Sequence, residues 1–78
     1  MKLTIDPEAN AAYMQLRERT GDLETVCVSD ELNVDLLPDG TVYGIEFLNA
    51  LQQLKADERG GFTVINRASG EKKTLKVA

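Results

Sequence analysis

Apolar residues alternate with polar ones in short runs along this chain, and a period of two is typical of β-strands. The runs cover residues 3–5, 26–28, 32–36, 43–47 and 62–64, and a last one spans 72–77. Turn-forming residues separate the runs, and those at 68–70 predict a final hairpin. Short strands with turn signals between them indicate an antiparallel meander.

One short helix is expected over residues 48–55, where leucines recur at helical spacing and two glycines at 60–61 follow as a stop signal. The sequence therefore predicts an α+β fold: a small antiparallel meander of five or six strands, with this helix after the central hairpin. A helix of two turns cannot cover such a sheet. We therefore expect apolar surface to remain exposed on one chain and a dimer to cover it.

Residues 6–17 fit two templates equally well. The stretch opens with Asp-Pro-Glu, which resembles a helix N-cap, a proline at the first helical position and an acid in the first turn. Some of its apolar residues recur three or four residues apart, as on one face of a helix. At Ala12, Met14 and Leu16 they also alternate with polar residues, as in a strand. These residues alone leave both alternatives open.

The central hairpin has two possible registers, and the length of its loop decides between them. A three-residue loop over 38–40 sets Leu37 opposite Thr41 and puts the apolar residues of the two strands on opposite faces. A loop of two residues (39–40) or four (38–41) brings them together, pairing Leu36 with Tyr43, Val34 with Ile45 and Leu32 with Phe47. Burying six large side chains is worth roughly 1.5–3 kcal/mol each, more than a turn preference. We therefore expect the even-length loop.

The same register makes neighbours of Asn33, Asp35 and Glu46 on the other face, with Gly44 opposite Asp35. A glycine within a strand often marks a bulge or the close approach of another group. These four residues form a candidate interaction patch where a cation or a basic side chain could dock. The alternative is an ordinary solvated face. The spacing of the acids does not fit a calcium-binding loop, so we assign no metal site.

Composition restricts the chemistry further. The chain has 78 residues, no His and one Cys. Without His there is no imidazole base, no Ser-His or Cys-His pair and no His-ligated zinc. Cys27 lies between two valines, where we expect a small buried side chain rather than a reactive thiolate. No phosphate-binding glycine loop is present. We therefore expect no catalytic residue, no cofactor and no enzymatic activity.

Charge is distributed unevenly. The net charge is −4, but residues 1–50 carry 3 basic and 10 acidic side chains, a net −7, whereas residues 51–78 carry 6 basic and 3 acidic ones, a net +3. The basic excess gathers in a late segment at Arg67, Lys72, Lys73 and Lys76. Such a segment could bind a charged partner, or a second copy head to tail. Alternatively, these cations protect the outermost strands from edge-to-edge pairing.

Two blocks of the sequence form a recognisable pattern. The first reads Asp-Pro-Glu-Ala-Asn-Ala-Ala-Tyr-Met-Gln-Leu over 6–16. The second combines Asn-Val-Asp-Leu at 33–36 with Gly-Thr-Val-Tyr-Gly-Ile-Glu-Phe-Leu-Asn-Ala at 40–50. Together they resemble the small bacterial and archaeal family known as domain of unknown function 2283, over residues 1–52. The rest of the chain lies outside the pattern.

The resemblance implies two strands within residues 1–17, joined by a helical turn at about 7–10. The family tends to have Asp where Asn10 stands and a large apolar residue where Ala12 stands. It often has a second acid where Leu37 stands, and its absence here argues against a metal site. We expect a single domain over 1–78, with a family-like core over 1–52. A C-terminal hairpin extension over 61–78 could reach into a neighbouring chain.

Three function hypotheses follow. The first is a non-catalytic interaction module that forms a homodimer or serves as the antitoxin-like partner of a small basic protein, since similar proteins are often found beside small toxin-like genes. The second is a DNA-binding regulator that uses the basic segment 67–76. The third is a divalent-cation binder or an enzyme built on Asp35 and Glu46. We favour the first because groups suited to catalysis are scarce.

The sequence also gives an expectation about location. No stretch approaches the roughly 18 apolar residues that a membrane helix needs, and the first apolar run is too short for the core of a secretory signal. A single Cys cannot form an internal disulfide, so the fold does not require an oxidising compartment. We therefore expect a cytoplasmic protein without membrane attachment.

Overall fold

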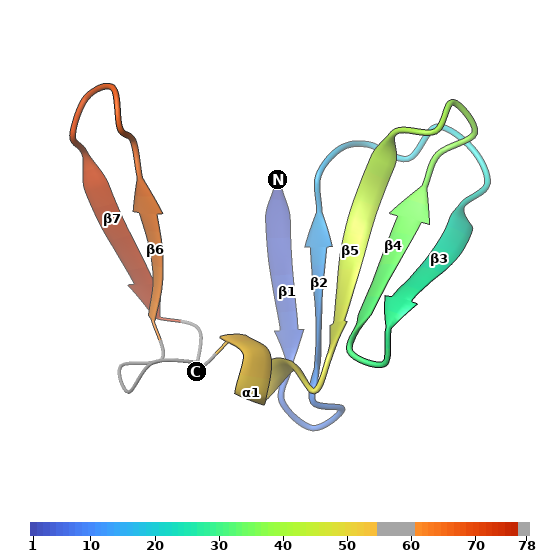
Figure 1. The fold of residues 1–78 in the computed structure, drawn as a ribbon, viewed down its shortest axis with the longest axis horizontal. Coiled ribbons are helices and arrows are strands. Elements are labelled where there is room, and N and C mark those ends of the chain that lie inside the picture. The colour runs from blue at the N-terminus through green and yellow to red at the C-terminus, as the bar shows by residue number, and fades with distance from the viewer. Residues whose placement is uncertain (55–60, 77–78) are drawn as a thin grey trace.

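The computed structural model describes residues 1–54 and 61–76. Its elements are strands β1 (Lys2–Asp6), β2 (Ala11–Gln15), β3 (Glu24–Ser29), β4 (Leu32–Leu36) and β5 (Val42–Leu48), helix α1 (Ala50–Leu54), and strands β6 (Gly61–Ile65) and β7 (Lys72–Lys76). The first five strands form one antiparallel sheet, and β6 and β7 form a separate two-stranded sheet (Figure 1). The predicted α+β fold, with five antiparallel strands and a short helix after the central hairpin, is confirmed.

The strand order β1-β2-β5-β4-β3 departs from a simple meander at one point. Strands β3, β4 and β5 are consecutive neighbours, but β2 pairs with β5 instead of β3. This pairing sets Ala12 opposite Phe47 and Met14 opposite Ile45. The longest strand, β5, therefore lies at the centre of the sheet and is paired on both of its edges, with β2 and β4. The segment 16–23 carries the chain from β2 to the far edge of the sheet.

The N-terminal hairpin resolves the ambiguity over residues 6–17 in favour of two strands, as the family resemblance implied. The expected helix-start chemistry is present, because one Asp6 carboxylate oxygen accepts from the backbone N–H groups of Glu8 and Ala9 at 3.1 and 3.2 Å. It supports a single turn over 7–10. Asn10 then adopts a left-handed conformation (φ 51°), which ends the turn, and β2 begins at the next residue.

The central hairpin of β4 and β5 pairs as predicted along most of its length. Val34 lies opposite Ile45, and Leu32 lies opposite Phe47. The loop, however, has three residues, 38–40, because the Leu37 N–H donates to the Thr41 carbonyl oxygen at 2.9 Å. The expectation of an even-length loop was wrong.

Turn chemistry and a bulge together explain this difference. Pro38 suits the first central position of a β-turn that the Gly40 N–H closes onto the Leu37 carbonyl at 2.9 Å. Gly40 is also the last residue of the three-residue loop, and its φ of 87° is the left-handed conformation that this position adopts in such hairpins. One extra residue in β5 then shifts the register, so that Leu36 lies opposite Val42 instead of Tyr43. The odd loop and the bulge compensate each other, so the other apolar residues still share a face, whereas the Tyr43 ring lies beside Tyr13.

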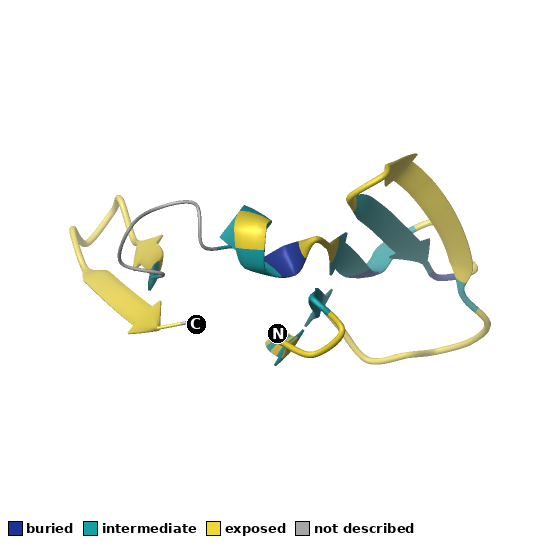
Figure 2. Ribbon diagram, turned by 90° about the horizontal axis from the view of Figure 1, so that it is seen from below, coloured by how far each residue is buried: buried dark blue, intermediate teal, exposed yellow. Residues whose placement is uncertain are grey.

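Helix α1 covers little of the sheet. It follows β5 directly and lies at the end of the sheet where β1 and β5 finish (Figures 1 and 2). Among the described residues, only Ala12, Leu37 and Ala50 are buried apolar residues, and no large side chain is fully buried. Most apolar strand residues are half-buried, as the teal ribbon in Figure 2 shows. The described part of the chain therefore lacks a closed core of large side chains.

The predicted C-terminal hairpin is present, with β6 and β7 joined by a turn over 66–71. It stands apart from the five-stranded sheet, on the other side of α1 (Figure 1). Three predicted features, the helix end at Lys55, the stop at Gly60 and the strand end at Val77, lie outside the described residues. Within the described chain, no helix has the length and apolar character needed to cross a membrane.

Candidate functional site

The structure brings together the four residues of the predicted interaction patch. In the β4–β5 pairing, Asn33 lies opposite Glu46 and Asp35 lies opposite Gly44, as the register argument predicted. The Asn33 side-chain amide donates to the Glu46 carboxylate at 2.9 Å. Asn33, Asp35 and Glu46 are half-buried, and Gly44 is buried. The patch therefore sits on the polar face of the sheet, centred between β4 and β5.

Two further residues complete this cluster, and sequence reasoning missed both. The Tyr13 hydroxyl on β2 donates to one Asp35 oxygen at 2.5 Å, and the Thr25 hydroxyl on β3 donates to the other at 2.6 Å. Tyr13 reaches Asp35 by lying across β5 at Gly44. A Cβ atom at position 44 would collide with the Tyr13 ring. The mid-strand glycine thus marks the close approach of a side chain from the same chain.

The environment of Tyr13 keeps it a hydrogen-bond donor. Burial, the hydrogen bond to Asp35 and the negative charge of that carboxylate all raise the pKa of Tyr13 far above its usual value of 10.0. The Tyr43 ring, which the bulge turns toward it, lies 6.3 Å away between ring centroids at an angle of 47°. At neutral pH, Tyr13 is therefore a fixed neutral donor and a poor nucleophile.

The chemistry of the cluster is that of a satisfied hydrogen-bond network. Both oxygens of Asp35 accept from neutral hydroxyls, and Glu46 accepts from a neutral amide. Across the described part of residues 1–54, no carboxylate lies within 4.0 Å of a Lys or Arg nitrogen. The same residues contain no group of three acidic or Cys side chains placed to hold a metal ion. A cationic group that docked here would meet carboxylates whose charge has no counter-ion in the described chain.

The prediction for Cys27 was wrong. It was predicted to be a small buried side chain, but it is exposed on the edge strand β3, on the same face as the cluster. Its flanking valines are exposed as well, at 41% for Val26 and 58% for Val28. The apolar sequence around Cys27 was misleading because an edge strand has only one neighbour to cover it.

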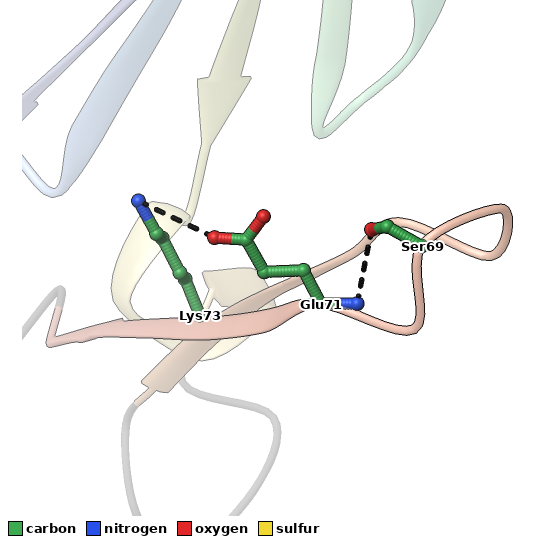
Figure 3. Close-up of polar contacts among 3 residues, drawn as sticks. All are labelled: Ser69, Glu71 and Lys73. Carbon is green, nitrogen blue, oxygen red and sulfur yellow. Dashed lines mark hydrogen bonds and ion pairs between the residues drawn. The ribbon is translucent and has the colours of Figure 1, made fainter.

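The predicted basic segment is divided between the two faces of the C-terminal hairpin. Lys72 and Lys76 lie opposite Ile65 and Gly61, whereas Lys73 lies opposite Val64 on the other face. The fourth residue, Arg67, is exposed in the turn. Figure 3 shows how this end of the hairpin is held. The Glu71 N–H donates to the Ser69 hydroxyl at 3.1 Å, and the Lys73 ammonium lies 3.8 Å from the Glu71 carboxylate. The basic residues thus form no single stripe of the kind that nucleic-acid-binding surfaces use.

The chain is thus a small antiparallel-sheet protein in which the half-buried carboxylates of Asp35 and Glu46 accept hydrogen bonds from neutral donors. A family model described as "Protein of unknown function (DUF2283)" matches residues 2–50, and the chain belongs to this family. The match covers β1 to β5 and the first residue of α1 and leaves the C-terminal hairpin outside. No curated protein and no solved structure gives a significant match.

Proposed function

We propose that this protein is a non-catalytic interaction module that acts by self-association, most simply as a homodimer. The observation that carries this proposal is the lack of a closed core in the described chain. Its buried apolar residues are two alanines and one leucine, and no large side chain is fully buried. A folded chain of this size gains most of its stability from burying apolar surface, so a second layer must cover the half-buried face.

The exposed area supports the same proposal. The chain exposes 5872 Å². A compact folded monomer of this mass is expected to expose about 4,700 Å². The excess of about 1,200 Å² is more than the ~800 Å² that each partner buries in a standard protein interface. The single chain thus presents enough surplus surface for a stable dimer.

Size-exclusion chromatography with light scattering tests this proposal directly. The full chain is measured over a hundredfold range of protein concentration, with far-UV circular dichroism to verify the sheet. We expect a mass near twice that of the chain at the higher concentrations. A folded protein that stays monomeric throughout would contradict the proposal.

A second candidate partner is a small basic protein, which the antitoxin-like hypothesis names. The observation that favours it is the set of carboxylates on the polar face, Asp35 and Glu46, which have only neutral donors beside them. A cationic partner would supply the missing opposite charge.

Calorimetric titration with an oligolysine peptide provides the test. We expect weak, salt-sensitive binding that falls in a variant carrying both Asp35→Asn and Glu46→Gln. If a variant that removes two distant acids, Glu8→Gln with Glu18→Gln, lost as much binding as the Asp35→Asn/Glu46→Gln variant, the effect would be one of general charge. That result would argue against a docking patch.

A further inference from the structure

The C-terminal hairpin exposes apolar side chains on one of its faces. In the β6–β7 register, Phe62 lies opposite Leu75 and Val64 lies opposite Lys73, so these four residues share one side, here called the hairpin face. Its apolar members are exposed at 36% for Phe62, 51% for Val64 and 60% for Leu75. An isolated two-stranded hairpin is at best marginally stable in water, so this one needs a surface to pack on.

The five-stranded sheet offers a matching surface. Its strand residues on the side opposite the polar cluster form what is here called the sheet face, which comprises Leu3, Ile5, Ala12, Met14, Glu24, Val26, Ser29, Leu32, Val34, Leu36, Val42, Ile45 and Phe47. Most of these side chains are half-buried. Neither α1 nor the hairpin extends across this sheet in Figures 1 and 2.

Charge makes the two faces complementary. Glu24 is the one charged residue among the described strand residues of the sheet face, and Lys73 is its counterpart on the hairpin face. The same opposition holds on a larger scale. Residues 1–50 carry a net −7, whereas the hairpin carries four cations against the single acid Glu71. The exposed pair of Lys73 with Glu71, at 3.8 Å, is of a kind worth little and leaves Lys73 free to change partner.

We propose that the hairpin is an exchanged arm: the hairpin face of one copy docks on the sheet face of a second copy, and the second copy returns the contact. Lys73 then lies near Glu24 of the other copy. This inference rests on the self-association proposed above and names the surfaces that carry it. Reciprocal exchange closes a two-fold dimer and leaves no free copy of either surface.

The position of the hairpin is why a second copy, and not the chain's own sheet, is the occupant. In one chain the hairpin stands apart from its own sheet, on the other side of α1 (Figure 1). Among the described residues, β6 and β7 pair with each other and form a sheet of their own. In the described part of one chain, neither surface therefore covers the other, and two chains can cover all four surfaces at once.

The first test disrupts the apolar contact with a matched control. Leu75→Asp places a carboxylate on the hairpin face, and Thr74→Asp places the same group one residue earlier, on the opposite face of the same strand. We expect Leu75→Asp to raise the dimer dissociation constant at least about tenfold, as the loss of a buried contact does. Thr74→Asp should leave it unchanged. Both residues are exposed in the single chain, so the five-stranded sheet should keep its circular dichroism spectrum in both variants.

The second test separates exchange between chains from docking within one chain. Glu24→Lys and Lys73→Glu each set like charges against each other in a homodimer, and each should weaken dimerisation. Mixing the two variants should restore it, because each of the two contacts then joins opposite charges. Lys72→Glu, on the other hairpin face, is the matched control and should leave dimerisation unchanged.

Each outcome decides between these alternatives. Recovery on mixing supports the exchanged arm. Recovery only when both substitutions are in one chain would show docking within that chain and would overturn the proposal. A dimer whose affinity is unchanged by Leu75→Asp would also overturn the exchanged arm while leaving self-association intact. The same holds if Thr74→Asp weakens the dimer as much as Leu75→Asp does. A wild-type protein that is always monomeric would refute both.

Discussion

At the scale of single residues, Gly44 and Tyr13 depend on each other. The Tyr13 ring occupies the space that a side chain at position 44 would fill, and its hydroxyl is held by Asp35 on the far side of β5. Moving the ring to make room would break that hydrogen bond. The glycine is therefore required by a side chain from the neighbouring strand β2 and not by its own backbone conformation.

Replacing Gly44 should reveal this dependence. We expect Gly44→Ala to lower the free energy of unfolding by about 1–3 kcal/mol, the usual cost of overpacking. In a Tyr13→Ala background the same substitution should cost under about 1 kcal/mol, because the two positions are coupled by contact. Urea denaturation of the four proteins measures the coupling. Equal costs in both backgrounds would mean that Tyr13 is not what excludes a side chain at position 44.

Tyr13 should also make the stability of the folded protein depend on pH in the alkaline range. Its pKa is raised above 10.0 in the folded chain, so the unfolded chain loses this proton first as the pH rises. The contribution of Tyr13 to the free energy of unfolding is then fully present below pH 10 and declines as the pH rises further. Tyr13→Phe should unfold with a shallower loss of stability above pH 10 than the wild type. Parallel curves for the two proteins would contradict the assignment.

At the scale of elements, α1 begins at a cap supplied by a distant turn. The Asn10 side-chain oxygen accepts from the Leu51 N–H at 2.8 Å, and its carbonyl accepts from the Ala50 N–H at 3.0 Å. Its amide group donates to Asn49 and Gln52 at 3.3 and 3.1 Å. The turn between β1 and β2 thus fixes the start of a helix forty residues away in the sequence, and a helix of only five residues needs such support.

This cap explains why Asp is compatible with position 10. Asn10→Asp keeps the oxygen that accepts from Leu51 and loses only the two donors, whereas Asn10→Ala loses every side-chain contact and places an alanine at φ 51°. We expect the alanine variant to be less stable than the aspartate variant by about 1–2 kcal/mol in thermal or urea unfolding.

Asn10→Gly is the matched control, because glycine removes the backbone strain and leaves only the missing cap. Its stability should fall between those of the two other variants. If Asn10→Asp were as unstable as Asn10→Ala, the amide donors would be the important contacts in place of the cap.

The elements show where sequence reasoning succeeds and where it stops. The alternation of apolar and polar residues within 32–36 and 43–47 was enough to predict that Val34 pairs with Ile45. Placing all the apolar side chains on one face buries them together, and the stabilisation from that burial is large. It could not place the bulge at Tyr43, because burial specifies which residues share a face but not how the chain accommodates an extra residue. Pro38 and Gly40 carried the missing signal, since proline followed two residues later by glycine suits the three-residue loop.

The candidate site divides in the same way. Asn33, Asp35, Gly44 and Glu46 belong to one hairpin, so local register predicted their meeting. Tyr13 and Thr25 enter from β2 and β3, and their contact with Asp35 depends on the pairing of β2 with β5. That pairing joins segments about thirty residues apart, and a single sequence offers no periodic signal for it. The mid-strand glycine at position 44, where the Tyr13 ring passes over β5, was the one clue available.

At the scale of the whole molecule, the half-covered sheet links stability to association. If a second copy completes the core, folding and binding share one equilibrium, and dilution shifts it toward unfolding. We expect the midpoint of thermal unfolding to rise by several degrees over a hundredfold increase in protein concentration. Calorimetry or circular dichroism at matched scan rates would measure it. A midpoint independent of concentration would identify a monomer that is stable by itself.

The bulge at Tyr43 also bears on how relatives of different length should be compared. It adds one residue to β5 between Val42 and Gly44, while the loop over 38–40 keeps its own geometry. A relative one residue shorter in this region can lose that extra residue and keep the remaining strand side chains on the same faces. In an alignment the gap then belongs at position 43, inside a strand, and a gap placed by habit in the loop would misassign the turn glycine.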